Sequence, residues 1–412
     1  MQSLMILGRQ PAIGLAELES IYGAGKLQPL GQSAVIVDID PCLMAFDRLG
    51  GSIKFCKLLT TIESSEWEKI EKFLIQVSPD KSKTMPDGKM RLGLSAYGFD
   101  IPEKNIMASG LKIKKAVQKT GRNVRFIPNK SNELNSAQVI HNKLTSPNGW
   151  ELIIVRNGNS TVIGQTVKVQ DIASYTLRDR GRPKRDARVG MLPPKLAQII
   201  INLAAGNIPE SKLESICDIP ADQKIPAPVL DQTVLDPFCG TGVISTEAAL
   251  MGYHALATDL DKRMVDYTLE NFTWLRDKFP VGHLEVRANQ ADATNYTWKQ
   301  PFDFVASEIY LGQAFTSFPD NETLAKAMST TNLILRKFLT NLAPQINSGT
   351  RLCLAIPAWQ QSPGKYRTLP LIDQISELGY NRLRFKHVGN DELIYSRSNQ
   401  TVARQLLILT RK

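Results

Sequence analysis

Closely spaced metal ligands are absent from this 412-residue sequence. Its five cysteines and four histidines are scattered along the chain, and no Cys-x-x-Cys pair occurs. Structural zinc sites are usually assembled from such pairs. The spacing therefore predicts no metal centre, structural or catalytic.

Long apolar runs are missing as well. A helix that spans a bilayer needs about 20 predominantly apolar residues in succession. The apolar run at residues 4–7 is too short for the core of a secretory signal, and Pro11 soon follows it. We therefore expect no membrane partner and take the cytoplasm as the default location.

Acidic residues are the minority charge. The chain has 50 lysines and arginines against 40 aspartates and glutamates, a net charge of +10 and a pI near 9.3. This balance favours a polyanionic partner, although charge alone indicates attraction and not a function. The length predicts about two or three domains, and a hydrophobic fraction of 42% is normal for globular cores.

Two common nucleotide-binding signatures are also absent from the most informative stretch. Residues 235–242 read Leu-Asp-Pro-Phe-Cys-Gly-Thr-Gly, with neither Gly-Lys-Ser/Thr nor Gly-x-Gly-x-x-Gly, so a triphosphate loop and a dinucleotide fingerprint are disfavoured. An apolar run precedes this stretch and a helical pattern at 243–251 follows, which predicts strand, tight turn and helix. Because Gly240 and Gly242 lack a Cβ, a ligand can approach the main chain beside a helix N-terminus.

Acidic residues end two predicted strands. Asp236 stands where the first strand meets the loop and can accept a hydrogen bond from a charged amine or a hydroxyl group. About two dozen residues further on, a short apolar strand ends at Asp259, a position at which an acid commonly binds ribose hydroxyls. The two carboxylates therefore predict a nucleoside-containing cofactor.

Strand and helix patterns alternate from residue 233 onward, which is typical of an α/β fold with a parallel sheet covered by helices. Strands are predicted at 234–235, 255–258, 284–288, 304–307 and 351–356, and segments 383–388 and 403–409 are predicted to close the sheet as an antiparallel pair. Helices are predicted at 262–278, 321–342 and 369–378.

The first third of the chain has an α+β pattern. Strands are predicted at 3–7, 33–38 and 91–97, with a hairpin of 150–155 and 161–166 over Asn157-Gly158. Helices are predicted at 12–22, 110–120 and 136–144. The helix at 110–120 and the strand after it are basic, which suits either RNA phosphates or a solvated charged face.

The densest charge cluster lies at residues 178–188 and has no apolar periodicity, so we expect a linker or surface loop. Pro193 and Pro194 then introduce a helix with an apolar stripe at Leu196, Ile199 and Leu203. Residues 206–227 contain proline and serine and predict a loop.

Several of these segments together resemble one family. Residues 178–186 read Arg-Asp-x-x-Arg-Pro-x-x-Asp, residues 190–198 read Gly-Met-Leu-Pro-Pro-Lys-Leu-Ala-Gln, and the loop 236–242 follows. This order resembles the THUMP-containing tRNA guanine-N2 methyltransferases of archaeal and eukaryotic type. The similarity covers most of the chain and is strong from about residue 175 to residue 292.

The resemblance implies a Rossmann-like class I methyltransferase domain at 191–412, an N-terminal α+β region with a THUMP-like RNA-binding domain at 1–170, and a basic linker at 171–190. It implies S-adenosylmethionine as the cofactor and tRNA, or another structured RNA, as the partner; it identifies no small activating protein. The implied cofactor-binding residues are Asp236, Pro237, Phe238, Gly240, Gly242, Asp259, Leu260, Asp292 and Ala293. The implied RNA-binding residues are Lys112, Lys114, Lys115, Lys119, Arg122, Arg125, Arg178 and Arg182.

The chain departs from the family at the catalytic motif. The family has Asp/Asn-Pro-Pro-Tyr/Phe, whereas this chain has Glu308-Ile309-Tyr310-Leu311 in that place. Glu308 retains an acceptor oxygen for the target amine, and Tyr310 is the candidate for stacking on the base. The double proline is missing, so the rigidity that it gives to the loop is lost.

Three functions fit these residues. The first is methylation of a guanine amino group in tRNA, with Glu308 and Tyr310 as catalytic residues and the target base flipped out of its stack. The second is a weakly active or inactive RNA-binding relative or partner subunit that keeps the cofactor pocket. The third is a nucleic-acid methyltransferase that acts on adenine N6. For the arginines of the charge cluster, contact with phosphates and bracing of the pocket both remain open.

Overall fold

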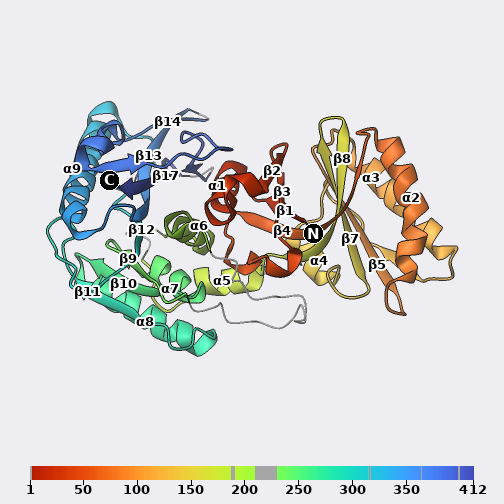
Figure 1. Cartoon of the computed structure of the whole chain (residues 1–412), viewed down its shortest axis with the longest axis horizontal. Coiled ribbons are helices and arrows are strands. Elements are labelled where there is room, and N and C mark those ends of the chain that lie inside the picture. The colour runs from red at the N-terminus through yellow and green to blue at the C-terminus, as the bar shows by residue number, and fades with distance from the viewer. Residues whose placement is uncertain are drawn as a thin grey trace.

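Two β-sheets organise the chain. The computed structural model describes residues 2–186, 191–208, 230–313, 315, 317–362, 364–397 and 400–412. Within these residues one sheet is built from residues 3–169 and the other from residues 233–411. Figure 1 shows the sheets toward opposite ends of the long axis, with helices α1 (Pro11–Tyr22), α5 (Ile172–Arg180) and α6 (Pro194–Ala205) between them.

The first sheet has the strand order β2-β3-β1-β4-β8-β7-β5-β6. Its strands are β1 (Ser3–Leu7), β2 (Leu27–Leu30), β3 (Ala34–Val37), β4 (Ser52–Ile62), β5 (Met90–Tyr97), β6 (Val124–Phe126), β7 (Gly149–Asn157) and β8 (Ser160–Val169). Neighbouring strands are antiparallel, except that β5 runs parallel to β6 and β7. Helices α2 (Trp67–Lys83) and α3 (Glu103–Gln118) pack on its outer part, away from the second sheet (Figure 1). The short helix α4 (Ser136–His141) precedes β7.

The second sheet has the order β11-β10-β9-β12-β13-β17-β15. Its strands are β9 (Thr233–Asp236), β10 (His254–Asp259), β11 (Val286–Gln290), β12 (Phe304–Glu308), β13 (Arg351–Ser362), β15 (Tyr380–Arg382) and β17 (Val402–Arg411). The first five are parallel, and β17 is antiparallel to both of its neighbours. Two short strands lie off this path: β14 (Lys365–Arg367) pairs with β13, and β16 (Ile394–Tyr395) pairs with β17.

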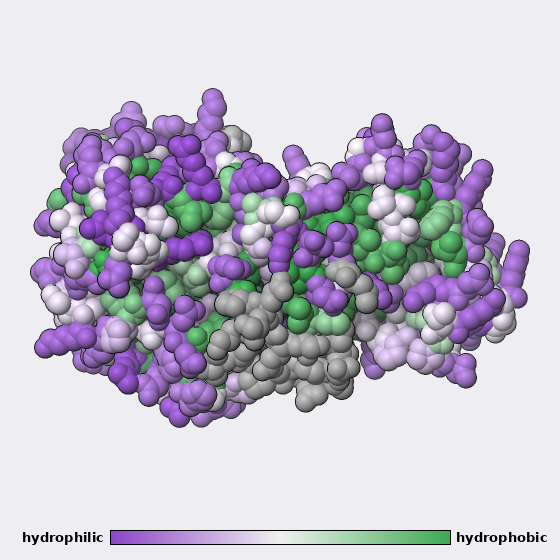
Figure 2. Space-filling model, viewed as in Figure 1, coloured by the Kyte–Doolittle hydropathy of each residue, from purple (hydrophilic) through white to green (hydrophobic). Residues whose placement is uncertain are grey.

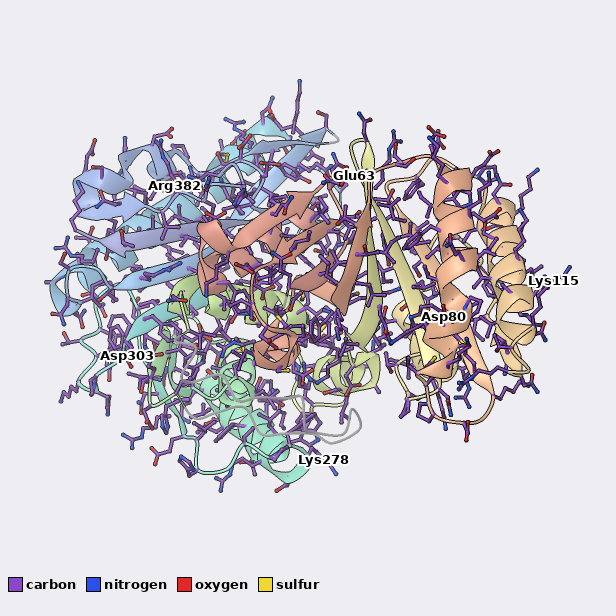
Figure 3. The ribbon with its side chains drawn as sticks, turned by 45° about the vertical axis from the view of Figure 1, so that its right-hand side comes forward. Glu63, Asp80, Lys115, Lys278, Asp303 and Arg382 are labelled. Carbon is purple, nitrogen blue, oxygen red and sulfur yellow. The ribbon has the colours of Figure 1, made fainter. Side chains whose placement is uncertain are left out.

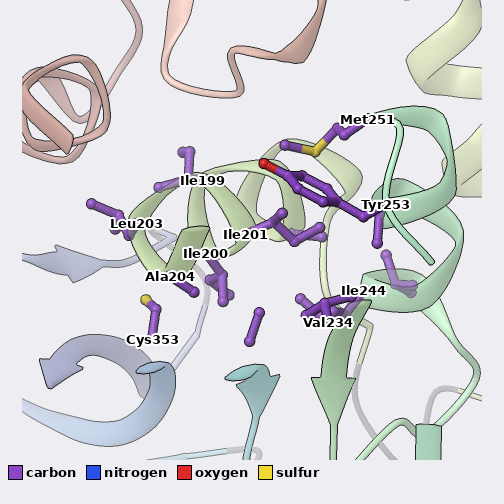
Figure 4. Close-up of a cluster of buried hydrophobic side chains, with 14 of the residues drawn as sticks. Ile199, Ile200, Ile201, Leu203, Ala204, Val234, Ile244, Met251, Tyr253 and Cys353 are labelled. Atoms are coloured by element: carbon purple, nitrogen blue, oxygen red, sulfur yellow. The ribbon is translucent and has the colours of Figure 1, made fainter. Parts of the chain in front are cut away.

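Alternating side chains of this sheet enter separate cores on its two faces. Val234 lies in the core beneath α6, α7 (Val243–Leu250) and α8 (Lys262–Lys278), whereas its neighbour Leu235 lies in the core beneath α9 (Asn321–Leu342). Figure 4 shows the first of these cores, in which α6 presents Ile200 and Ala204 toward the strands. Helices on both faces of a mostly parallel sheet confirm the Rossmann-like α/β class, and the sheet of residues 3–169 confirms the α+β region.

A buried polar cluster fastens α1 to α6, and we call its residues Glu17, Arg48 and Asn202 the junction. The Asn202 amide donates to Glu17 Oε1 at 2.7 Å, and Arg48 Nε donates to Asn202 Oδ1 at 3.2 Å. The Glu17 carboxylate also accepts the backbone N–H groups of Gly50 and Gly51. Burial raises the pKa of Glu17 to about 7 despite these bonds. Because Ile13 and Ala16 of α1 pack into the same core as α6, apolar and polar contacts together join the two halves.

Most predicted elements are confirmed, although several have other bounds: the strand predicted at 284–288 is Val286–Gln290, the helix predicted at 136–144 ends at His141, and the segment predicted as a helix at 369–378 is a 3-10 helix, Pro370–Leu378. Three further differences have structural reasons or larger shifts. Residues 172–180 form α5, although part of this segment was predicted as a linker or loop; its helix is supported by side-chain contacts with α6 and α7, not by an apolar stripe. The closing strand is Tyr380–Arg382 and not 383–388. The basic helix begins at Glu103, seven residues before the predicted start. Most of the loop predicted at 206–227 lies outside the described residues.

The described helices offer no membrane crossing, since none of them combines the length and the apolar character that this requires. Figure 2 shows hydrophilic side chains over most of the visible face of both halves of the molecule.

Candidate active site

Four carboxylates gather at one edge of the second sheet. Asp236, Asp259 and Glu308 are the last residues of β9, β10 and β12, and Asp292 follows the end of β11 by two residues. These four strands are parallel neighbours in the order β11-β10-β9-β12. Since the carboxyl ends of parallel strands meet at one edge, the topology brings together acids that are up to 72 residues apart in sequence, as the positions 236 and 308 give. This edge is where open α/β sheets bind their ligands.

The loop between β9 and α7 is shaped by its glycines. Gly240 and Gly242 have φ angles of 50° and 77°, in the left-handed region that favours glycine. A Cβ on Gly242 would lie 2.8 Å from the Thr268 side chain of α8, so the loop is packed tightly against that helix. Thr268 Oγ1 also donates to the Gly240 carbonyl at 3.1 Å. These contacts therefore fix the main-chain conformation of the loop at the N-terminus of α7.

Asp236 is the most deeply buried of the four acids, with 1% of its surface exposed. Ser307 Oγ donates to its Oδ1 at 2.6 Å. Burial outweighs this bond and raises the pKa of Asp236 to about 7. A cationic ligand group beside Asp236 would therefore stabilise the ionised carboxylate.

Asp259 is partly tied into the loop. Its Oδ2 accepts the Gly240 N–H at 2.8 Å and its Oδ1 accepts the Asp261 N–H at 2.9 Å. Each carboxylate oxygen can accept a second hydrogen bond, so both remain able to receive a hydroxyl group. Burial raises the pKa of Asp259, and Leu260 beside it is 70% exposed, an open apolar surface next to the acid.

The remaining predicted cofactor residues surround the same edge. Asp292 Oδ1 accepts from the N–H and the hydroxyl of Thr294, at 2.9 and 2.7 Å. Ala293 is buried, and the Phe238 ring packs edge-on against Phe338 with 5.2 Å between centroids. The Pro237 carbonyl accepts from Thr258 Oγ1 at 3.3 Å. These residues all lie at the carboxyl edge of the sheet.

The candidate catalytic carboxylate has a partner that the sequence did not indicate. Arg404 of β17 donates from Nε to Glu308 Oε1 at 2.7 Å, and their side chains are 5% and 13% exposed. Arg404 also donates to Gln400 Oε1 at 3.0 Å. No described group donates to the second oxygen of Glu308, Oε2. The pair thus keeps Glu308 in one orientation and leaves one of its oxygens available.

The two residues after Glu308 point in different directions. Ile309 is 2% exposed and donates its backbone N–H to the Ala355 carbonyl, which continues the pairing of β12 with β13. Tyr310 is 47% exposed. The aromatic ring that the sequence offered for stacking therefore lies on the surface directly beyond the carboxylate.

The predicted RNA-binding residues divide into two groups. Lys115, Lys119 and Arg125 are exposed on α3 and after it, and Figure 3 shows Lys115 on the outer side of α3. Lys114 is half-buried, and Lys112 is exposed but pairs with Glu71 of α2 at 2.7 Å. The Arg122 guanidinium, by contrast, donates hydrogen bonds to backbone carbonyl groups at and just after the end of α2, and to the Asn148 side chain at 2.9 Å. Its placement indicates a structural brace and not a phosphate contact.

Arg178 and Arg182 also lie inside the structure. Arg178 pairs with Glu247 of α7 at 2.7 Å and stacks on Tyr175, with side-chain exposures of 10% for Arg178 and 1% for Glu247. Arg182 is 6% exposed, and no described group accepts from its Nε or Nη2. Of the two roles left open for these arginines, bracing fits this burial, and their prediction as phosphate contacts does not.

The segment around these arginines is strapped to the glycine loop. Asn271 of α8 exchanges two hydrogen bonds of 2.9 Å with the main chain of Lys184 and donates to the Thr241 carbonyl at 2.8 Å. Asn271, Thr268, Ser307 and Arg404 support the site and were given no role from the sequence. The sequence gives little indication of these roles, because each is an isolated polar residue whose partner is distant in sequence.

Comparisons with known proteins agree with this geometry. Residues 228–358 match the UPF0020 family model, described as RMKL-like, methyltransferase domain. Two curated relatives are named tRNA (guanine(10)-N2)-dimethyltransferase. The relative from Methanothermobacter thermautotrophicus is 28% identical over 41% of this chain and 39% of its own length. The relative from Methanocaldococcus jannaschii is 29% identical over 31% of this chain and 30% of its own length. The chain thus matches well under half the length of these relatives.

A solved structure extends the likeness to the whole fold. The crystal structure of TrmN from Thermus thermophilus aligns over 100% of both chains, with a TM-score of 0.51 and 14% sequence identity. This likeness concerns the fold alone, and it includes the region before the second sheet. These matches confirm the family resemblance and the class I methyltransferase fold, for which S-adenosylmethionine is the cofactor. The second sheet of this chain therefore has the class I methyltransferase fold, and residues 228–358 within it are similar to the RMKL-like methyltransferase domain.

Proposed function

We propose that this chain transfers a methyl group from S-adenosylmethionine to the exocyclic amine of a guanine in tRNA. The observation on which the proposal depends is the meeting of Asp236, Asp259, Asp292 and Glu308 at the carboxyl edge of four neighbouring parallel strands, beside an open glycine loop. The names of the two curated relatives support the guanine amine of tRNA as the target.

The residues at this edge fit the proposed cofactor part by part. The buried Asp236 suits the positively charged amino group of the methionine moiety, and the glycine loop leaves room for that moiety along its main chain. Asp259 suits the ribose hydroxyls, with Leu260 as an apolar surface beside it. Asp292 suits the adenine amine. The bound cofactor supplies a methyl group that its sulfonium already activates, so the protein's task is mainly to position the nucleophile.

Glu308 would act on the target amine. The lone pair of the guanine amine is delocalised into the ring, which makes the amine a weak nucleophile. Oε2 of Glu308 would accept a hydrogen bond from the amine and so orient its nitrogen toward the methyl carbon. As the amine takes the methyl group that the bound cofactor supplies, Glu308 or water would accept the proton that the nitrogen loses. Tyr310, exposed just beyond, would stack on the flipped base.

The rest of the chain would hold the RNA. We propose a THUMP-like RNA-binding region at residues 1–170, a basic connecting segment at 171–190, and the methyltransferase domain at 191–412. The exposed cations on and after α3, Lys115, Lys119 and Arg125, suit sequence-independent contacts with tRNA phosphates. A tRNA substrate also suits a cytoplasmic setting.

Methyl transfer to an unmodified tRNA transcript tests the proposal. We expect purified protein and labelled cofactor to yield N2-methylguanosine, identified by mass spectrometry of the digested RNA. Cofactor binding with no transfer to tRNA would contradict the proposal and favour an RNA-binding relative. Label recovered as N6-methyladenosine would contradict the guanine target and favour the adenine reaction.

The titration of Asp236 gives a second expectation. A positively charged amine beside the carboxylate favours the ionised form, so cofactor binding lowers a pKa that is about 7 in the free protein. Binding then releases protons near neutral pH, and affinity rises by about tenfold from pH 6 to pH 8. Calorimetry in buffers of different ionisation enthalpy measures both quantities.

The matched variant is Asp236→Asn, which keeps the shape and cannot ionise. Its affinity should be lower and should change little between pH 6 and pH 8. Asp259, whose pKa burial also raises, accounts for any release that remains. Equal proton release in the wild type and in Asp236→Asn would refute the assignment of Asp236 to the charged amine.

A further inference from the structure

A cavity of about 520 Å³ lies where the two halves of the molecule meet. Its walls come from five places in the chain: the turn before α1, residues 50–53, α5, the start of α6, and β16 with the segment after it. Figure 1 shows α1, α5 and α6 together at this position between the sheets. We call this cavity the junction cleft.

Positive charge dominates the junction cleft. Its charged lining residues are Arg9, Arg180, Lys195 and Arg397, against the single carboxylate of Asp179. Within the described part of the chain, none of these four cations makes an ion pair. Four cations held close together without carboxylate partners repel one another, so an anion in the cleft would be stabilised by all of them.

The cations are positioned by neutral groups. Arg9 donates to the Ser396 carbonyl at 2.7 Å, and Arg397 donates to the Tyr395 hydroxyl at 3.3 Å and lies over its ring. The Lys195 ammonium bonds the Gln170 side chain and lies 5.0 Å from the centre of the Tyr175 ring. Neutral partners fix these side chains without cancelling their charge.

The start of α6 adds to this field. Pro193 and Pro194, the N-cap and first residue of this 12-residue helix, line the cleft. Proline has no N–H to donate, so these two residues offer no hydrogen bond, but the N-terminal end of the helix has a partial positive charge. The helix therefore favours the same kind of ligand as the four side chains.

The cleft adjoins the candidate reaction site through a short series of contacts. Tyr395 of the cleft is the registered partner of Arg404 in the β16–β17 pair. Arg404 in turn donates to Glu308. Two contacts, the strand pairing of Tyr395 with Arg404 and the ion pair of Arg404 with Glu308, therefore connect the cleft to the carboxylate proposed to orient the target amine.

We propose that the junction cleft binds a backbone phosphate of the RNA close to the target nucleotide. This inference rests on the proposed function, since it takes RNA as the ligand. A phosphodiester matches the excess of positive charge, and guanidinium groups bind phosphate oxygens with two parallel hydrogen bonds. Holding the backbone on one side of the reaction site fixes where a flipped base enters it.

The test uses the full chain with the double variant Arg180→Gln and Arg397→Gln. Arg180 is exposed and Arg397 bonds a single described hydroxyl, so both changes are mild. Affinity for an unmodified tRNA transcript, measured by fluorescence anisotropy from 50 to 300 mM salt, should fall at least about tenfold. The magnitude of the slope of log K against log salt should fall by about one, as expected for the loss of one phosphate contact. Affinity for S-adenosylhomocysteine and the thermal midpoint should stay unchanged.

Lys337→Gln is the matched control, because Lys337 is an exposed cation on α9, on the far side of the second sheet. It should leave both affinity and slope as in the wild type. Wild-type affinity and slope in the double variant would overturn the cleft proposal while leaving methyl transfer, and thus the proposed function, intact. A wild-type protein that neither binds nor methylates tRNA would overturn both proposals.

Discussion

Replacing Glu308 by alanine should slow methyl transfer to tRNA by at least about a hundredfold, the lower range of what a positioned acid or base contributes. The amine would lose the acceptor that orients it and eases loss of its proton. Affinity for the cofactor product should stay within about twofold, because the proposed cofactor contacts come from β9, β10 and the segment after β11. Single-turnover kinetics with labelled cofactor measure the rate, and calorimetry measures the affinity.

Two further variants make this result specific. Glu308→Gln keeps an acceptor oxygen and the bond to Arg404 but lacks the charge, so its rate should lie between those of the wild type and the alanine variant. Glu285→Ala removes an acid that is 56% exposed and pairs on the surface with Arg287, and it should have wild-type activity. Full activity in Glu308→Ala would show that the amine is oriented by another group.

Replacing Arg404 by methionine should destabilise the protein by about 3–5 kcal/mol, since breaking a buried ion pair leaves its partner charged and unpaired. The Glu308 side chain, 13% exposed in the wild type, would then have no cation to offset its burial. Urea unfolding of the full chain measures the change.

Two controls identify the pair as the cause. Adding Glu308→Gln to Arg404→Met removes the unpaired charge and should restore part of the lost stability. Arg287→Met breaks an exposed pair with Glu285, where each partner is more than half exposed, and should cost less than about 1 kcal/mol. If Arg404→Met unfolds at the same urea concentration as Arg287→Met, the buried pair has no stabilising role.

Local patterns in the sequence were sufficient for the region around the cofactor loop. The apolar run before Asp236, the glycines after it and the second acid at 259 are separated by short distances along the chain, and the parallel sheet follows from strand–helix alternation. Helices α8 and α9 have the bounds that were predicted for them, and in the structure each has an aspartate N-cap, Asp261 and Asp320.

The sequence was insufficient where long-range polar contacts decide the structure. Arg404 reaches Glu308 across 96 residues, so neither residue alone indicates the pair. The helix α5 has no apolar stripe and no fully buried residue. Its Arg178 is held by Glu247 and Tyr175, contacts that the charged sequence does not reveal, so the segment resembled a linker. In β4, the buried Lys54 interrupts the apolar alternation, and its partners Glu151 and Ser95 lie on other strands.

The junction of Glu17, Arg48 and Asn202 has a consequence for how a nucleotide would be chosen. Because it joins α1 to α6 by buried hydrogen bonds, it opposes rotation of the first sheet relative to the second. An RNA bound at α3 would then place in the reaction site only a nucleotide at a fixed distance along its backbone. The protein would thus select a nucleotide first by its distance along the RNA from the bound end. The identity of the base would be checked only after that nucleotide had entered the reaction site.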